Sequence, residues 1–251
     1  MALHCASNES AVVSSSIATT MEGVANLTMG AWMRRNASSG RMSFGQSDDS
    51  EHRTVLLLWS DGNMYCSVAN GGFPSATVAD NDTNWGHHLL RYDGALTDTN
   101  RVKYYKNGSF SSNSTSGPPA TTYASFVNEF DIGRYRGTSA SDGDLGDGAL
   151  WNVTLTEAEI AQLGAGLCPL LVRPAALAHY WRLVNGTYED LVGGVNMSTA
   201  VGTPSATGHN PIIYPGSAIY LSHEAPAVGG ANPKGPLGHP LHGALAGPIG
   251  P

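Results

Sequence analysis

Few side chains of this sequence have types and spacings that could do chemistry, and the most compact group of them is acidic. Asp142, Asp144 and Asp147 lie within a six-residue stretch that also contains two glycines. Ca²⁺ prefers hard oxygen ligands, and a glycine-rich loop can turn several carboxylates toward one ion, although the spacing here is not that of an EF-hand. Two interpretations therefore stand: a calcium site, with calcium as the one cofactor to consider, or a solvated acidic turn before the strand that holds Trp151.

A second pair of acids has the spacing of a catalytic pair. Retaining glycoside hydrolysis needs two carboxyl groups about 5 Å apart, and a β-strand places residues i and i+2 on the same face. Glu129 and Asp131 come nearest to this pattern. We find neither a glycine-rich phosphate loop between a strand and a helix nor a Gly-x-Ser-x-Gly nucleophile motif. The sequence therefore predicts no enzymatic activity.

Aromatic side chains on the expected strands offer a different chemistry. Trp59, Tyr65 and Tyr105 could present the flat faces on which sugar rings stack, and we predict glycan binding through them. The alternative is that they fill the core or pair across strands, as strand aromatics often do. His87 and His88 are adjacent on one strand and must face opposite sides, so they cannot chelate one ion together.

Composition excludes several classes of partner. Lys and Arg number 13 and Asp and Glu 20, which gives a net charge of −7 and a charged fraction of 13%, about half the usual value. A chain without basic clusters is not a nucleic-acid binder. The longest apolar run, Val55–Trp59, is far short of the ~20 residues that cross a bilayer, and Met1–Ser10 lacks the features of a secretory signal. We expect Cys5, Cys66 and Cys168 to be reduced and buried.

These residues must be positioned by short strands. From residue 3 to about 155, β-type runs alternate with Gly, Asn, Asp and Ser turns, which indicates an antiparallel sandwich. The turns Ser60–Asn63 and Lys106–Ser109 contain Asp-Gly and Asn-Gly pairs and predict hairpins. The predicted strands are Ala11–Ser15, Leu27–Arg34, Arg41–Gln46, Arg53–Trp59, Asn63–Ala69, Trp85–Tyr92, Arg101–Lys106, Phe130–Arg134 and Gly148–Val153.

One short helix is predicted after the last of these strands. Thr156 and Glu159 form a capping box, Ile160 and Leu163 make an apolar stripe, and the glycine at 164 or 166 can end the helix. We expect this helix to pack on the sandwich.

Five segments, in order, resemble the laminin-G-like or concanavalin A-like jelly-roll family: Leu27–Trp32, Trp85–Gly94, Val102–Gly108, Phe130–Arg134 and Gly148–Ile160. The resemblance implies an all-β fold of two curved antiparallel sheets with a terminal helix. Glycoside hydrolases of this broad class carry a Glu-x-Asp-x-x-Glu strand motif, whose third acid is here Arg134. The resemblance therefore also speaks against catalysis.

The chain is expected to have three parts. Residues 1–170 form the jelly roll, and residues 171–221 add trailing strands that complete the sandwich, since about 45 residues are too few for another core. In this family a stretch like Leu177–Leu183 usually precedes the first strand, whereas here it follows the helix. Residues 222–251 are rich in Gly and Pro and form an extended tail.

A four-residue repeat marks the tail from Pro236 onward. Pro240 and Pro248 exclude a helix and leave an extended or polyproline-like segment. Two alternatives stand: a flexible terminus, which such a composition usually forms, or a strap whose regularly spaced apolar side chains dock on a neighbouring subunit or a large assembly. We predict the strap. The predicted docking residues are Leu237, Leu241, Leu245 and Ile249.

Two functions from different classes follow. Laminin-G-like domains with such a trailing Tyr-Trp segment are familiar in tailed bacteriophages, so the first is a decoration or fibre-associated protein of a virus particle. It would be located in the virion, bound to other virion subunits through its tail and oligomeric. The alternative is a carbohydrate-binding module of a bacterial surface or secreted protein, located outside the cell and binding glycans.

Overall fold

The computed structural model describes most of the chain up to residue 213. The described residues are 2–5, 10–14, 17–37, 40–47, 52–70, 75–124, 130–133, 135, 142–183, 189–197, 199–201, 205–208 and 212–213. The chain divides into a compact unit of residues 1–215 and a second unit, residues 216–251, which lies outside the described residues.

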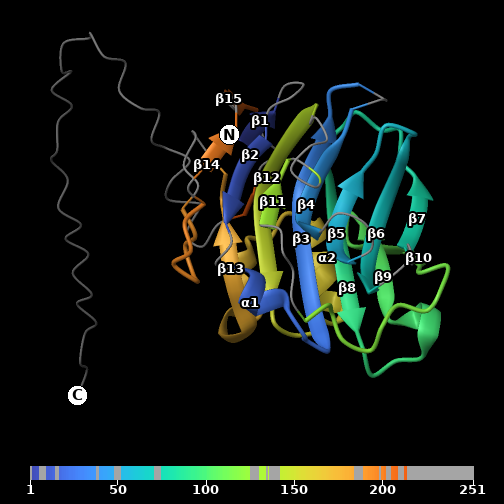
Figure 1. Ribbon diagram of the computed structural model, residues 1–251. Coiled ribbons are helices and arrows are strands. Elements are labelled where there is room, and N and C mark those ends of the chain that lie inside the picture. Colours follow the sequence, from blue (N-terminus) through green and yellow to red (C-terminus); the bar gives the residue numbers. More distant parts are fainter. Residues whose placement is uncertain are drawn as a thin grey trace, which may run out of the picture. The chain divides into compact units, whose positions relative to one another are not determined.

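Two antiparallel sheets stack face to face in this unit (Figure 1). Among the described residues, sheet A has eight strands and sheet B has seven. Sheet A has the order β10-β9-β8-β3-β12-β1-β15, with β13 also paired to β12, and sheet B has the order β14-β2-β11-β4-β5-β6-β7. This is the β-sandwich that the sequence predicts.

The strand bounds, in chain order, are β1 Ala2–Cys5, β2 Ser10–Ser14, β3 Asn26–Arg35, β4 Met42–Ser47, β5 His52–Leu58, β6 Asn63–Asn70, β7 Ser75–Ala79, β8 Gly86–Asp93, β9 Val102–Lys106, β10 Ser109–Asn113, β11 Phe130–Ile132, β12 Gly143–Trp151, β13 Leu177–Trp181, β14 Thr199–Val201 and β15 Ser205–Thr207. The helices are α1 Ala18–Met21 and α2 Glu157–Gly164, with 3₁₀ helices at Asp98–Asn100, Pro169–Leu171 and Pro174–Ala176.

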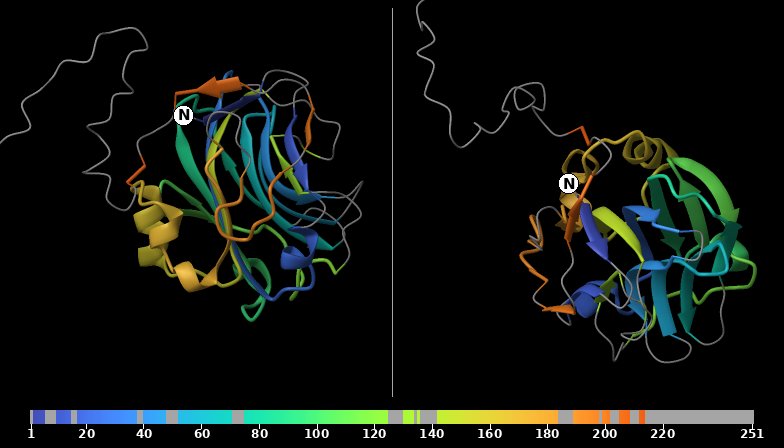
Figure 2. Two further views of the ribbon diagram at one scale, coloured as in Figure 1. Left: turned by 90° about the vertical axis from the view of Figure 1, so that its left-hand side faces the viewer. Right: turned by 90° about the horizontal axis from the view of Figure 1, so that it is seen from above.

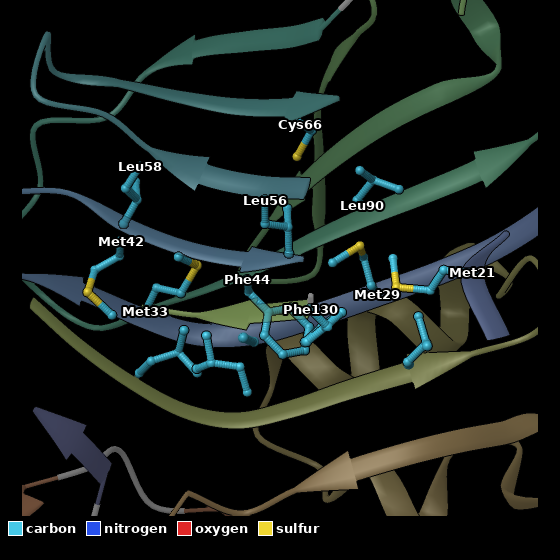
Figure 3. Packing of buried hydrophobic residues seen from close by; sticks show 14 of the residues in the cluster. Met21, Met29, Met33, Met42, Phe44, Leu56, Leu58, Cys66, Leu90 and Phe130 are labelled. Atoms are coloured by element: carbon cyan, nitrogen blue, oxygen red, sulfur yellow. The ribbon is translucent and has the colours of Figure 1, made fainter. Parts of the chain in front are cut away.

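The main core fills the space between the sheets (Figure 3). Alternate residues of each strand point inward, so β3 contributes Met29 and Met33 while β5 contributes Leu56 and Leu58. Phe44 of β4 lies edge-on to Phe130 of β11, with ring centroids 5.2 Å apart. Because inward residues alternate with outward ones, the core fixes which side chains sheet B presents on its outer face.

Helix α2 forms a second core on the outer face of sheet A. Thr156 and Glu159 make the predicted capping box at its start, and Ile160 and Leu163 are buried. They pack with strand residues that include Trp151, whose indole N–H donates to the carbonyl of Val172 at 2.9 Å. Figure 2 shows α2 and the helices that follow it on one side of the sandwich.

The segment after α2 supplies three strands. β13 pairs with β12 in sheet A, β14 with β2 in sheet B and β15 with β1 in sheet A. The chain then returns to the end of α2, where Ile213 pairs with Leu167. Both sheets are therefore completed by residues that follow the helix.

Several details differ from the sequence prediction. Strands β1, β7 and β10 were not predicted, and β12 begins at Gly143 rather than at Gly148. The one-turn helix α1 was also not predicted.

The three cysteines are buried and form no disulfide. Among the described residues, no helix has the length and apolar character needed to cross a membrane.

Candidate functional site

A cluster of aromatic and polar side chains lies on the outer face of sheet B, at the hairpin that joins β5 and β6. Leu56 and Leu58 face the core, so Leu57 and Trp59 face outward. The antiparallel register pairs Leu57 with Tyr65 of β6, which places Tyr65 on the same face. The predicted hairpin is present: the Gly62 N–H donates to the Trp59 carbonyl at 3.1 Å, and Gly62 has φ 83°.

The aromatic rings of this face contact one another. Tyr135, which follows β11, is buried over Val55 and Leu57. Its ring meets the Trp59 ring edge-on, with centroids 5.7 Å apart. Trp59 and Tyr65 pack against this group and remain half-buried. We call Arg41, Trp59, Ser60, Asp61, Tyr65 and Tyr135 the hairpin platform.

Hydrogen-bonding groups border the aromatic rings. The Tyr65 hydroxyl donates to Asp61 Oδ2 at 2.5 Å, and the Asn63 backbone N–H donates to Asp61 Oδ1 at 2.9 Å. Desolvation acts to raise the pKa of Asp61, but these hydrogen bonds outweigh it and the pKa is lowered. The same bond to Asp61, assisted by burial, raises the pKa of Tyr65. At neutral pH the platform therefore carries an ionised carboxylate and an intact phenol.

Arg41 provides the positive charge of the platform. Residue 41 precedes β4, directly beyond the Met42 and Leu58 pair, and so comes opposite Trp59. Its guanidinium carbon lies 4.1 Å from the centroid of the Trp59 ring, which is a cation–π contact. Its Nη2 donates to Ser60 Oγ at 3.0 Å. Arg41 is thus held over the indole by two contacts.

A second arginine supports the hairpin from inside. Arg35 of β3 is 1% exposed and donates to the carbonyls of Trp59, at 2.8 Å, and Asn63, at 2.9 Å. Burial lowers the pKa of Arg35, which still leaves an arginine charged. Through these two bonds β3 fixes the backbone that carries Trp59.

The three aromatic residues predicted to bind sugars lie in two different places. Trp59 and Tyr65 come together, whereas Tyr105 is fully buried in the second core. Its hydroxyl donates to Glu157 Oε1 at 2.6 Å, and burial with this bond raises its pKa to about 12. Tyr105 is therefore a packing residue between sheet A and α2.

Most of the predicted acidic loop belongs to strand β12, so Asp144 and Asp147 are buried in the sheet and are not part of a solvated turn. Asp144 is fully buried and accepts from Arg34 Nε, at 2.7 Å, and from His4 Nδ1, at 2.7 Å. Asp147 is also buried, at a bulge in β12, and accepts from the Tyr180 hydroxyl. These carboxylates are used by separate partners, and the described part of the chain gathers no three acidic, His or Cys side chains around one metal position.

The remaining predicted residues fall in different places. Asp142 accepts from Asn36 Nδ2 at 3.0 Å. His87 and His88 face opposite sides of β8 as expected: His87 lies against Trp32, and His88 Nδ1 is 2.9 Å from the Tyr104 hydroxyl. Asp131 is buried on β11, while Glu129 and Arg134 lie outside the described residues. The predicted docking residues Leu237, Leu241, Leu245 and Ile249 lie outside them as well.

Four platform residues escaped the sequence analysis: Arg41, Tyr135 and the turn residues Ser60 and Asp61. Arg41 comes opposite Trp59 through the register of β4 with β5, which the predicted Ser60–Asn63 turn between β5 and β6 does not set. Asp61 was read only as a turn residue. Tyr135 gave no signal, since it follows a three-residue strand and reaches the platform from a distant part of the chain.

Comparison with known proteins agrees with this architecture. A family model described as the concanavalin A-like lectin/glucanases superfamily matches residues 7–161. Among curated proteins, no sequence matches this chain significantly.

Similar solved structures include two that concern carbohydrates. A "putative carbohydrate binding protein" from Bacteroides ovatus ATCC 8483 superposes with a TM-score of 0.53 and 19% identity over 85% of this chain and 62% of its own. The leech intramolecular trans-sialidase superposes with a TM-score of 0.50 and 13% identity over 63% of this chain and 26% of its own. This chain spans less than two thirds of both, and the likeness is one of fold.

Proposed function

Because the chain belongs to the concanavalin A-like lectin/glucanase superfamily, we propose that it is a carbohydrate-binding protein and that the hairpin platform is its binding surface. The proposal is for binding without turnover. Hydrolysis of the usual kind needs two carboxyl groups across the scissile bond, and the platform has a single one, Asp61.

One observation carries the proposal: Trp59 and Tyr65 lie half-exposed on one surface, with charged and hydroxyl groups at the edges of their rings. A sugar ring has an apolar face of C–H groups and a rim of hydroxyls. Aromatic rings bury the apolar face of the sugar. Groups such as Asp61, Ser60 and Arg41 can exchange hydrogen bonds with its hydroxyls. Arg35 and the tight turn hold the backbone beneath, so little ordering is needed on binding.

The test is to substitute Trp59→Ala and measure binding on a glycan array, followed by calorimetry with the best ligand. Loss of one stacking face should weaken binding at least tenfold, which is about 1.4 kcal/mol. Phe110→Ala is the matched control, because Phe110 is 52% exposed on the edge strand β10, away from the platform. Unchanged affinity in Trp59→Ala, or an equal loss in Phe110→Ala, would contradict the proposal.

A second proposal concerns assembly and is supported by the sequence of residues 222–251. The repeat of Leu237, Leu241, Leu245 and Ile249 is suited to docking in successive apolar pockets, as expected of an accessory protein of a virus particle. Light scattering after size-exclusion chromatography should give an oligomer for the full chain and a folded monomer for residues 1–221. Two oligomers of the same size would refute the strap as the assembly element.

A further inference from the structure

We propose that the platform selects acidic sugars and that Arg41 contacts their anionic group, a carboxylate or a sulfate. This inference rests on the proposed carbohydrate binding and adds the class of ligand. It comes from the way in which the charge of Arg41 is held.

Arg41 differs in its partners from Arg91 and Arg173, which are also partly exposed. Arg91 pairs with Glu157 and Arg173 with Glu159, at N···O distances of 3.0 and 2.7 Å. In the described part of the chain, Arg41 has no carboxylate within ion-pair distance; its contacts are the Trp59 ring and Ser60 Oγ. Its charge is therefore oriented but not neutralised.

The stacking leaves most of the donors of Arg41 available. A guanidinium has five N–H donors in one plane, and the bond to Ser60 uses one of them. The remaining donors of Arg41 have no hydrogen-bond partner among the described residues. This fork matches two oxygens of a carboxylate or a sulfate, and aromatic stacking fixes it before the ligand arrives.

Neither Asp142 nor Asp61 cancels this charge. Asp142, whose backbone N–H donates to the Arg41 carbonyl at 2.9 Å, accepts from Asn36 Nδ2 with its side chain and forms no ion pair with Arg41 in the described structure. Asp61 lies in the same hairpin, but its oxygens accept from Tyr65 and Asn63, and it forms no ion pair with Arg41 in the described structure. The net charge of −7 opposes unspecific attraction of anions, so binding of an acidic glycan has to arise from this local contact.

The experiment compares acidic oligosaccharides with neutral counterparts by calorimetry on the full chain. Tetragalacturonate supplies carboxylates and a κ-carrageenan tetrasaccharide supplies sulfates, while methyl-esterified tetragalacturonate and neoagarotetraose are the neutral comparators. We expect an acidic probe to bind at least tenfold more tightly than its comparator, and Arg41→Gln to remove that difference, with about 1.4 kcal/mol per factor of ten. The acidic probe that binds identifies the anionic group as a carboxylate or a sulfate.

Lys103→Gln is the control, because Lys103 also lies over an aromatic ring, with Nζ 5.8 Å from the Phe110 centroid, but outside the platform. It removes the same charge and should keep the acidic preference. Binding of neutral sugars alone, weakened by Trp59→Ala but not by Arg41→Gln, would overturn the acidic preference and leave the proposed function standing. Absence of binding to all four probes and to the glycan array would overturn both.

Discussion

Asp190 shows how a single side chain can hold a long segment in place. Its Oδ1 accepts backbone N–H groups from Tyr180, Val192 and Gly193, at 3.0 to 3.1 Å. Its Oδ2 accepts from the Val195 backbone and, at 2.7 Å, from His179 Nδ1. Burial acts to raise the pKa of Asp190, but the hydrogen bonds dominate and lower it to about 2. One ionised carboxylate therefore fixes the turn that follows β13.

This pKa predicts an acid-sensitive contribution to stability. A carboxyl group with a folded pKa below its unfolded value stabilises the fold above the unfolded pKa, and this stabilisation is lost as pH falls through the folded value. The difference between 3.8 and about 2 corresponds to roughly 2 kcal/mol. Urea unfolding should show Asp190→Asn destabilised by about this amount at pH 7, with a smaller deficit near pH 2. A deficit independent of pH would contradict this account.

At the scale of elements, α2 is placed by backbone contact with the β9–β10 hairpin. A Cβ added at Gly164 would overlap the backbone of Asn107 and Gly108, which cannot move aside as a flexible side chain could. The helix end and the hairpin turn therefore meet without side chains between them. This contact holds α2 against the second core, in which Tyr105 and Trp151 are buried.

Gly164→Ala should accordingly destabilise the protein even though alanine favours helices. Overpacking of this kind costs about 1–3 kcal/mol, more than the gain of up to about 1 kcal/mol from helix propensity. Gly208→Ala is the control, since a Cβ there meets nothing within 4 Å. Thermal unfolding of the two variants measures the difference, and a Gly164→Ala protein as stable as the parent would show that α2 can shift freely.

Local signals predicted the elements well where one turn or cap decides the structure. The hairpin at Ser60–Asn63 and the capping box of Thr156 follow from neighbouring residues. Strand β1 and the first half of β12 depend on pairing between distant segments, which a local pattern does not encode. Asp144 illustrates the consequence: read locally it belongs to a polar turn, but in the sheet it is buried, forms an ion pair with Arg34 and accepts a hydrogen bond from His4.

The residues of the candidate site also fall into two groups, those that local sequence predicts and those that depend on distant packing. Trp59 and Tyr65 were predictable because one hairpin joins them, whereas Tyr105 has the same residue type and strand context but is covered by α2. Only the packing of the helix separates the two situations. Tyr135 and Arg35 reach the platform from other strands and could not be assigned from sequence.

For the whole molecule, two buried histidines predict weaker folding in mild acid. Desolvation, with the charge of His88 adding to it, lowers the pKa of His87 to about 3, and desolvation lowers that of His88 to about 4. Below pH 6.5 the unfolded chain binds protons at both residues before the folded protein does. The free energy of unfolding therefore decreases as the pH is lowered. Each histidine contributes a slope of up to about 1.4 kcal/mol per pH unit.

His87→Phe tests this slope. The substitution keeps an aromatic ring against Trp32, and His87 Nδ1 has no hydrogen-bond partner among the described residues. Urea unfolding between pH 7 and pH 4.5 should show a smaller decrease in the free energy of unfolding for this variant than for the parent. The difference should equal the contribution of one histidine. Parallel curves for parent and variant would mean that His87 is protonated in the folded state.

The position of β1 also determines when the protein can finish folding. Residues 2–4 lie between β12 and residues 205–207, so β1 has no complete place in its sheet until some two hundred further residues have been made. Such distant pairing slows folding, because the chain loses loop entropy before the contacts form. During synthesis, the backbone groups at the edges of β1 therefore stay unpaired for that interval. A chaperone or a rapid collapse of sheet B would protect them.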